Sequence, residues 1–288
     1  MNQSTKIKLA RSALSNALKF RRDNGYSIYE PIPLYDIIEK LGIELRFIEL
    51  SNIEGLYIRK PFPTILINTM RPQGRKLFTS AHELGHHVYK HGNAVDEVVD
   101  TYNNKSPDEF LVDCFAGYLL MPPAAVSKSL SMRNWSPINL TPEDVYLLSN
   151  YFGVGYSSFL SHMYYSLRII GTSTFDSLVK VQPIKIKEKI LGKSFKGHLV
   201  VLDDYWTTSV IELEVGDKIL LKDDHFLEGN CLVSEKGTES GVEINATMPG
   251  QGAIINKKNE AVIRIRVIRK EYQGRSIFRY LSDAEYGN

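Results

Sequence analysis

The sequence has 288 residues, of which 43% are hydrophobic and 24% are charged. This composition excludes a disordered chain, a collagen-like repeat and a disulfide-stabilised mini-protein. The 35 Lys and Arg residues nearly balance the 33 Asp and Glu residues, so the net charge of +2 does not indicate a nucleic-acid or anionic-membrane partner.

The compartment is predicted from the cysteines and from the apolar runs. Cys114 and Cys231 lie far apart and in no Cys-x-x-Cys pattern, which favours free thiols in a reducing compartment. No stretch approaches the roughly 18 consecutive apolar residues of a membrane span, and no signal-peptide pattern opens the chain. We therefore expect a cytoplasmic protein with no membrane partner.

The first quarter of the chain predicts two helices followed by three strands. Apolar residues recur at helical spacing over residues 6–22, and Asn24-Gly25 ends that pattern. A second, short helix is expected over residues 34–41, where Gly42 follows it. Strands of a small sheet are expected at residues 43–48, 55–59 and 64–68.

Two longer helices are expected next, separated by a loop at residues 93–106. The first runs from about Arg75 to Tyr89. The second has a well-defined start at Ser106-Pro107-Asp108-Glu109, because serine suits the N-cap, proline the first helical position and acids the first turn. It should continue to Leu120, and a further helix is expected over residues 124–132.

A pair of helices around Gly153 has helix-turn-helix proportions. The second of them, expected over residues 157–167, offers only Arg168 as a positive charge, so phosphate anchoring looks poor. We expect this pair to pack or to dock substrate, and direct nucleic-acid binding is not expected. From about Thr174 onward, apolar runs alternate with glycine-containing turns and predict a second, mainly β domain.

The chemistry is concentrated in His82-Glu83-Leu84-Gly85-His86, an H-E-x-x-H motif on the first of the two longer helices. Residues four apart share one helix face, so both histidines can bind a single zinc ion. Glu83 lies one step around the helix and is placed to take a proton from a water molecule polarised by the metal. This is the residue pattern of a metalloprotease.

A catalytic zinc site needs a third protein ligand. The metzincin extension requires glycine at position 89 and histidine at position 92, where this chain has Tyr89 and Gly92, so that class is excluded. We select Glu109, because it lies on the next helix and Asp113 shares its face; one acid can bind the metal while the other accepts an imidazole N–H. Asp113 is the strongest rival ligand, and the weaker rivals are Asp96, Glu97, Asp100 and Asp108.

Residues 75–86 and 109–122 together resemble the ImmA/IrrE family of zinc metallopeptidases. The second block is similar to that family's Glu-x-x-Ala-Asn-x-Phe-Ala-x-x-Leu-Leu-Met-Pro. The resemblance, which extends over about residues 10–170, implies that one Zn²⁺ per chain is bound by His82, His86 and Glu109 and that Glu83 is the base. Asp113 stands where the family usually has asparagine, which keeps a side-chain acceptor.

The sequence patterns and this resemblance together predict an α+β fold with three parts. These are a zincin-like metallopeptidase domain at residues 1–135, a helix-turn-helix-like helical extension at 136–173 and a mainly β domain of unknown role at 174–288. The last part departs from the GAF-like domain of some family members.

Known family members cleave helix-turn-helix repressors of phage, mobile-element or stress-response genes, so a repressor of this kind is the expected substrate. The alternative is a non-catalytic, zinc-containing regulator that binds a repressor or DNA. A structural zinc site has four protein ligands, and the sequence offers no well-spaced fourth.

Three further interpretations concern the surroundings of the motif. His87 and His91 are expected on the helix face turned away from His82, as exposed residues. Residues 64–68 are expected to be an edge strand that could hold a substrate by β-addition. Arg264 and Arg266 alternate with apolar residues, which predicts a half-buried strand with a solvated side.

Overall fold

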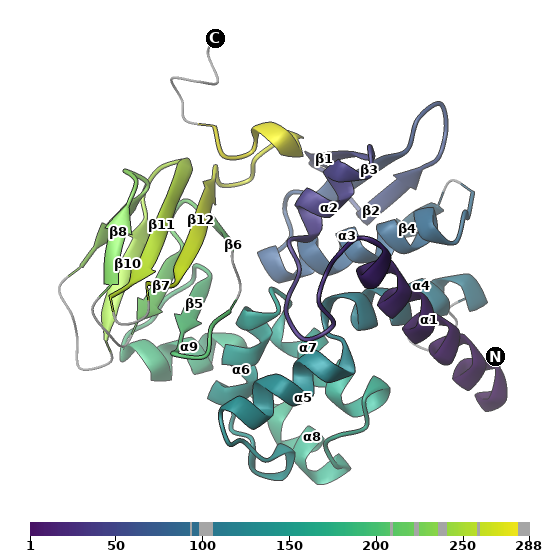
Figure 1. The fold of residues 1–288 in the computed structure, drawn as a ribbon, viewed down its shortest axis with the longest axis horizontal. Coiled ribbons are helices and arrows are strands. Elements are labelled where there is room, and N and C mark those ends of the chain that lie inside the picture. Colours follow the sequence, from purple (N-terminus) through teal and green to yellow (C-terminus); the bar gives the residue numbers. More distant parts are fainter. Residues whose placement is uncertain are drawn as a thin grey trace.

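The structure is a computed structural model that describes residues 1–92, 94–97, 106–207, 210–221, 225–235, 241–257 and 260–281, with backbone only for 94–97 (Figure 1). It combines helices and sheets, as the sequence predicts. The N-terminal part begins with the helices α1 (Gln3–Asp23) and α2 (Leu34–Lys40). Asn2 caps α1 by accepting a hydrogen bond from the backbone N–H of Thr5 at 2.9 Å.

A five-stranded sheet forms the core of the N-terminal part. Its order is β13-β1-β3-β2-β4, and its strands are β1 (Glu44–Ile48), β2 (Ile53–Ile58), β3 (Thr64–Asn68), β4 (Ala94–Glu97) and β13 (Gly274–Arg275). β1 and β3 are parallel, whereas β2 is antiparallel to both β3 and β4. β3 therefore lies inside the sheet, and the expectation that residues 64–68 form an edge strand is wrong.

The helix with the H-E-x-x-H motif, α3 (Gln73–Val88), contacts β2 and β3 on one side and α4 (Pro107–Leu120) on the other. The predicted start of α4 is confirmed, since Ser106 is its N-cap and accepts a hydrogen bond from the N–H of Glu109 at 3.2 Å. α1 packs against α4, with Ala13 and Ala17 fully buried. These contacts place the motif between a sheet and a second helix.

One stretch, Pro107–Met132, has the length and hydropathy of a membrane span, and 61% of its most apolar window is buried inside the protein. It consists of two helices, α4 and α5 (Pro123–Met132), that are interrupted at Met121, where φ is −127° and ψ is 64°. Helices packed into a core have this composition too, and Figure 1 shows both lying among other helices.

The helices after α5 differ in part from the sequence prediction. α6 (Pro142–Tyr151) and α7 (Tyr156–Ser161) form the pair around Gly153, but the chain turns π-helical over His162–Ser166 instead of continuing as an α-helix. In this wider turn the ring of His162 packs on Gly117 of α4, and its Nε2 lies 2.9 Å from the Met121 carbonyl oxygen. Gly117 leaves room for this ring, because a Cβ there would lie 2.8 Å from His162 Nδ1.

Two further helices, α8 (Thr172–Leu178) and α9 (Pro183–Leu191), occupy the region where strands were expected from about Thr174. In α9, Ile184, Ile186 and the lysines beside them alternate as in a strand. Pro183 at the first helical position and Gly192 at the C-cap, with a φ of 67°, set helical limits instead. The strand-rich region accordingly begins at Leu199.

In the described part of this region, the strands β5 to β12 form two four-stranded sheets. The first has the order β5-β7-β10-β9, with β5 (Leu199–Leu202), β7 (Lys218–Leu221), β9 (Leu232–Ser234) and β10 (Val242–Ala246). The second has the order β6-β12-β11-β8, with β6 (Val210–Glu214), β8 (His225–Glu228), β11 (Gly250–Asn256) and β12 (Val262–Ile268). Ile219, Ile244 and Ile265 on these strands are buried and belong to the hydrophobic core cluster.

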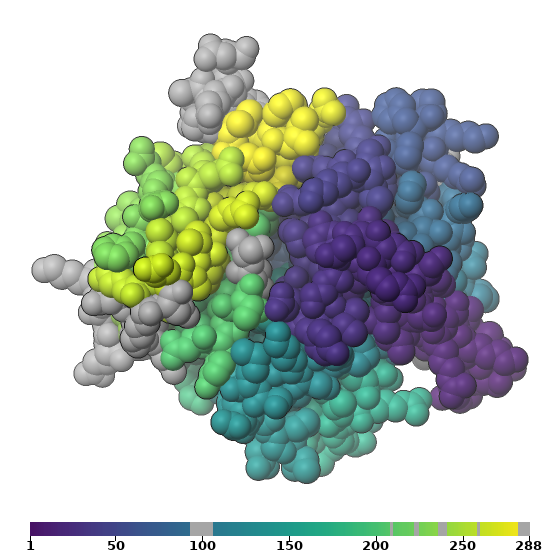
Figure 2. All heavy atoms as spheres, viewed as in Figure 1, coloured from purple at the N-terminus to yellow at the C-terminus, as the bar shows by residue number. Residues whose placement is uncertain are grey.

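Ion pairs and β13 join this strand-rich region to the N-terminal part. Arg266 of β12 binds Asp36 of α2 through two hydrogen bonds of 2.6 and 3.1 Å, so its side chain is not on a solvated face. Buried Arg279 binds Glu39 of α2 and Glu212 of β6. Figure 2 shows the yellow C-terminal segment lying directly against the purple N-terminal part.

Candidate functional site

The two motif histidines lie on the buried side of α3. His82 and His86 are 3% and 2% exposed, and Gly85 between them faces α4. A Cβ on Gly85 would lie 3.0 Å from the Cβ of Val112, so the glycine permits a close approach of the two helices. This approach brings the acids of α4 within reach of the histidines.

Glu109 meets both histidines. Its Oε2 lies 3.1 Å from His82 Nε2, its Oε1 lies 3.5 Å from His86 Nε2, and the two Nε2 atoms are 3.2 Å apart. A tetrahedral zinc ion with ligands at about 2.0–2.1 Å has edges of about 3.3 Å. Among the residues that the structure describes, these three form a group suited to a metal ion, and their donor atoms fit zinc.

Asp113 lies behind His82, away from the group of donor atoms. Its Oδ1 is 2.9 Å from His82 Nδ1, which is the arrangement in which a carboxylate accepts the second ring N–H of a metal-binding histidine. Of the two acids that the sequence left open, Glu109 faces the Nε2 atoms of both histidines, and Asp113 contacts Nδ1 of His82.

The charges of this group interact strongly. Burial disfavours charged His82, but its hydrogen bonds to Asp113 and Glu109 outweigh that effect and raise its pKa well above the ordinary value. The pKa of Glu109 is lowered, chiefly because Glu109 accepts a hydrogen bond from His82. Burial, and then the charge of His82, lower the pKa of His86 to about 4. Without a metal these shifts favour a protonated His82, an anionic Glu109 and a neutral His86, so a metal ion would have to replace the proton on His82 Nε2.

Glu83 is fully buried on the side of α3 that faces β2. A Cβ built on Gly55 of β2 would lie 2.9 Å from Glu83 Oε1 and 2.6 Å from Thr79 Cγ2. β2 therefore passes directly over this carboxylate and limits where it can move. The sequence singled out Glu83 but did not indicate that Gly55 lies beside its carboxylate.

The structure corrects the prediction for the histidines that follow the motif. His87 Nδ1 lies 2.9 Å from the hydroxyl of Tyr57 on β2, and His91 Nδ1 lies 3.0 Å from Nδ1 of His86. The helix ends at Val88, and Lys90 takes a left-handed conformation with a φ of 57°, so His91 folds back onto the motif. A lysine in this conformation gives no sequence signal, because glycine or asparagine is the usual residue there.

The other acids considered as ligands do not join the group, as far as they are described. Asp108 has a side chain that is 70% exposed, and its Oδ1 lies 3.9 Å from His91 Nε2. Asp96 and Glu97 lie on β4, but their side chains are outside the described residues, as is Asp100 entirely.

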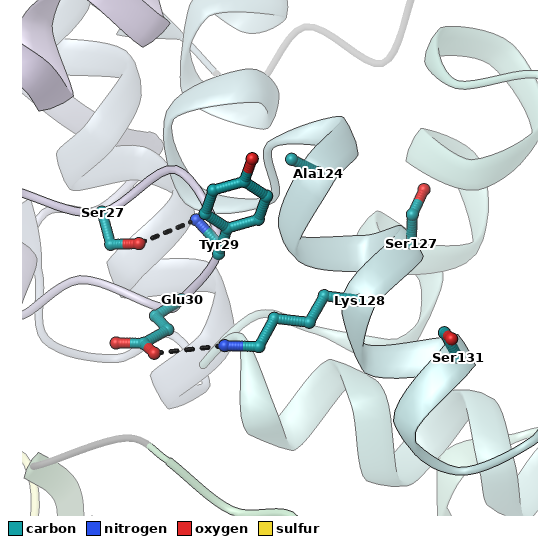
Figure 3. Close-up of a pocket in the computed structure, with 7 residues that line it drawn as sticks. All are labelled: Ser27, Tyr29, Glu30, Ala124, Ser127, Lys128 and Ser131. Carbon is teal, nitrogen blue, oxygen red and sulfur yellow. Dashed lines mark hydrogen bonds and ion pairs between the residues drawn. The ribbon is translucent and has the colours of Figure 1, made fainter.

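A pocket elsewhere on the surface contains none of the predicted site residues. It lies between the α1–α2 connection and α5 and is lined by Ser27, Tyr29, Glu30, Ala124, Ser127, Lys128 and Ser131 (Figure 3). Lys128 Nζ lies 3.3 Å from Glu30 Oε1 across it. The two charged side chains that line this pocket therefore pair with each other.

Comparison with known proteins identifies the part of the chain that contains the site. Residues 38–163 match the Peptidase_M78 family model, described as an IrrE N-terminal-like domain. The match includes α3 and α4 in full, and it confirms the resemblance seen in the two sequence blocks. This segment is therefore similar to a family of peptidase type.

More distant comparisons add little. No curated protein matches the chain. A Mycobacterium tuberculosis transcriptional regulator of known structure is similar at 12% identity and a TM-score of 0.31, over 57% of this chain and 48% of that one. The matched region spans about half the length of that structure, and a similarity this distant supports no argument about function.

Proposed function

We propose that this protein is a zinc-dependent endopeptidase, with its catalytic residues on α3 and α4 of a zincin-type domain. The observation that carries the proposal is the convergence of His82 Nε2, His86 Nε2 and the Glu109 carboxylate, with separations of 3.1 to 3.5 Å. The buried carboxylate of Glu83 on the same helix is placed to act as the base.

Each residue of the site has a separate role in the proposed mechanism. Zinc held by His82, His86 and Glu109 would act as a Lewis acid toward the scissile carbonyl. Glu83 accepts the proton of the attacking water and passes it to the leaving amine nitrogen. Asp113 keeps the His82 ring in position through its 2.9 Å hydrogen bond.

The proposed substrate is a helix-turn-helix repressor of phage, mobile-element or stress-response genes, and the proposed location is the cytoplasm. An extended segment of such a protein would pair with β4, because β4 is the outer strand next to β2, whereas β3 lies inside the sheet. The helical extension at 136–173 and the strand-rich region would recognise substrate or respond to a signal.

The test is incubation of the purified protein with the helix-turn-helix protein encoded beside it, followed by mass spectrometry of the fragments. Glu83→Gln should retain zinc and lose cleavage, because the amide cannot accept the proton. His86→Ala should lose both zinc and cleavage. A Glu83→Gln protein that still cleaves the substrate refutes Glu83 as the base.

The alternative, a regulator with a structural zinc, has a distinct signature. A structural site is closed by four protein ligands, whereas the described residues supply three at this position. A zinc-loaded protein that binds the repressor and leaves it intact under all conditions tested would favour the alternative.

A further inference from the structure

We propose that His91 is a positioning residue for the metal site, which fixes the ring of His86 by accepting a hydrogen bond from its Nδ1–H. The inference rests on the metal site proposed above, and it holds whatever the substrate is. His91 lies outside the H-E-x-x-H motif, and only the fold of the chain after α3 brings it to His86.

The ring of His86 contacts a different partner on each of its two nitrogens. Its Nε2 faces His82 and Glu109, at 3.2 and 3.5 Å, and its Nδ1 faces His91 Nδ1 at 3.0 Å. A neutral imidazole has one N–H and one lone pair. If Nε2 gives its lone pair to a metal, Nδ1 must carry the proton, and His91 Nδ1 must accept it.

The far side of His91 agrees with this proton arrangement. When His91 accepts through Nδ1, its own proton is on Nε2, which lies 3.9 Å from Oδ1 of Asp108. That separation exceeds a hydrogen bond, yet a nearby carboxylate still favours the N–H on that nitrogen. In this arrangement the Nδ1–H of His86 donates to His91 Nδ1, and the lone pair on His86 Nε2 remains for the metal.

The backbone holds His91 firmly in this position. Lys90, with its φ of 57°, reverses the chain, and the N–H of His91 donates to the carbonyl oxygen of His86 at 3.0 Å. The ring of Tyr89 stacks on that of His91, with centroids 5.8 Å apart, and the His91 side chain is only 19% exposed. These contacts hold the His91 ring against that of His86.

The two histidine ligands consequently donate from Nδ1 to different kinds of acceptor. His82 donates to the carboxylate of Asp113, whereas His86 donates to a neutral imidazole. A carboxylate acceptor raises the basicity of a ligand more than a neutral acceptor does. His86 is therefore the less electron-rich of the two ligands, and its orientation depends on His91.

The first test reads the ring protons directly and needs no variant. Histidine-selective ¹⁵N NMR of the zinc-loaded protein should show the proton of His86 on Nδ1 and that of His91 on Nε2. A His91 ring with its proton on Nδ1, or with protons on both nitrogens, would overturn the proposal, since it could not accept from His86.

The second test measures zinc affinity by competition with a chelator. We expect His91→Leu to bind zinc about 10–100-fold more weakly, and His91→Gln to recover part of the loss through its amide oxygen. His225→Leu, on β8 of the strand-rich region, is the matched control and should bind zinc like the wild type. A cooperative unfolding transition of each zinc-free variant would show that it is folded.

The outcomes separate this proposal from the proposed function. A folded His91→Leu protein with wild-type zinc affinity would overturn the role of His91 and leave the peptidase proposal standing. A protein that binds zinc with the expected dependence on His91, yet cleaves nothing, would support this inference and contradict only the peptidase. A wild type that binds no zinc would overturn both.

Discussion

Asp113 accepts a hydrogen bond of 2.9 Å from Nδ1 of His82, and it does so from the same face of α4 that carries Glu109. One helix therefore supplies both an acid that faces the Nε2 atoms of the two histidines and an acid that contacts the other nitrogen of His82. The relationship depends on a spacing of four residues, which places both carboxylates toward α3.

Loss of the Asp113 carboxylate should weaken zinc binding without unfolding the protein. Asp113→Leu should lower zinc affinity about 10–100-fold, because the His82 ring is no longer held, while Asp113→Asn should lose less because its amide oxygen still accepts. Chelator competition measures both, with exposed Asp176→Asn on α8 as the control. Equal affinities for Asp113→Leu and the wild type would contradict the role.

A side chain on Gly55 should impair catalysis more than zinc binding. Gly55→Ala places a Cβ 2.6 Å from Thr79 Cγ2 and 2.9 Å from Glu83 Oε1, so β2 or the carboxylate must move. We expect cleavage to fall about tenfold or more, since small displacements of a catalytic group are costly. Gly92→Ala is the control, because a Cβ there meets nothing within 4 Å. Unchanged cleavage by Gly55→Ala would show that Glu83 tolerates the shift.

The ion pair between Lys76 and Glu214 should couple α3 to the strand-rich region. The Lys76 side chain is 1% exposed, so either single variant, Lys76→Met or Glu214→Gln, leaves one charge poorly compensated. A double-mutant cycle on unfolding should give a coupling free energy of about 1–3 kcal/mol. The more exposed pair Lys185–Glu188 should give a much smaller coupling. Similar values for the two pairs would argue against this coupling.

Arg21 should stabilise the protein by donating hydrogen bonds to the carbonyl oxygens at the end of α4. Its guanidinium is fully buried and donates to the carbonyl oxygens of Leu119, Leu120, Ser27 and Glu30. Arg21→Met leaves these buried acceptors without their donor, and we expect a loss of about 3 kcal/mol in chemical unfolding. The neighbouring Arg22→Met, with a side chain that is 73% exposed in the wild type, should change stability by less than about 0.5 kcal/mol. Equal effects would contradict the capping role.

His162 should make the protein less stable in mild acid. Burial lowers its pKa from 6.5 to about 4 in the folded state, so the unfolded chain binds more protons between these values and stability falls as the pH drops through that range. From about pH 7 to about pH 5 the loss due to His162 is about 2 kcal/mol. His162→Gln should lack this part of the acid sensitivity when both proteins unfold in the presence of a chelator. Identical losses in the two proteins would disprove the assignment to His162.

Most of the helices were predictable because their limits are local. Ser106 and Pro107 start α4 where the sequence places it, and α3 spans the expected stretch within two residues at its N-terminus. The helix α9 was not predicted, because its alternating Ile and Lys residues suit a strand. Its limits are nevertheless those of a helix, with Pro183 at the start and Gly192 at the end. In such short segments, local capping outweighs the apolar period.

The order of strands was not predictable from chain order. Residues 64–68 are a strand, as expected, but they lie between β1 and β2, because β1 pairs with them in parallel and β2 folds back on the other side. Strand pairing joins residues distant in sequence, and no local pattern records which neighbour a strand takes.

The sequence by itself determined the histidine pair, the glutamate between them and the acids on the next helix, since a spacing of four residues places side chains on one helix face whatever the rest of the chain does. Only the tertiary structure decided that Glu109 meets the histidines while Asp113 stands behind one of them, because this depends on how closely α3 and α4 pack at Gly85. The return of His91 to His86 likewise depends on one residue, Lys90, in a left-handed conformation that its side chain does not signal.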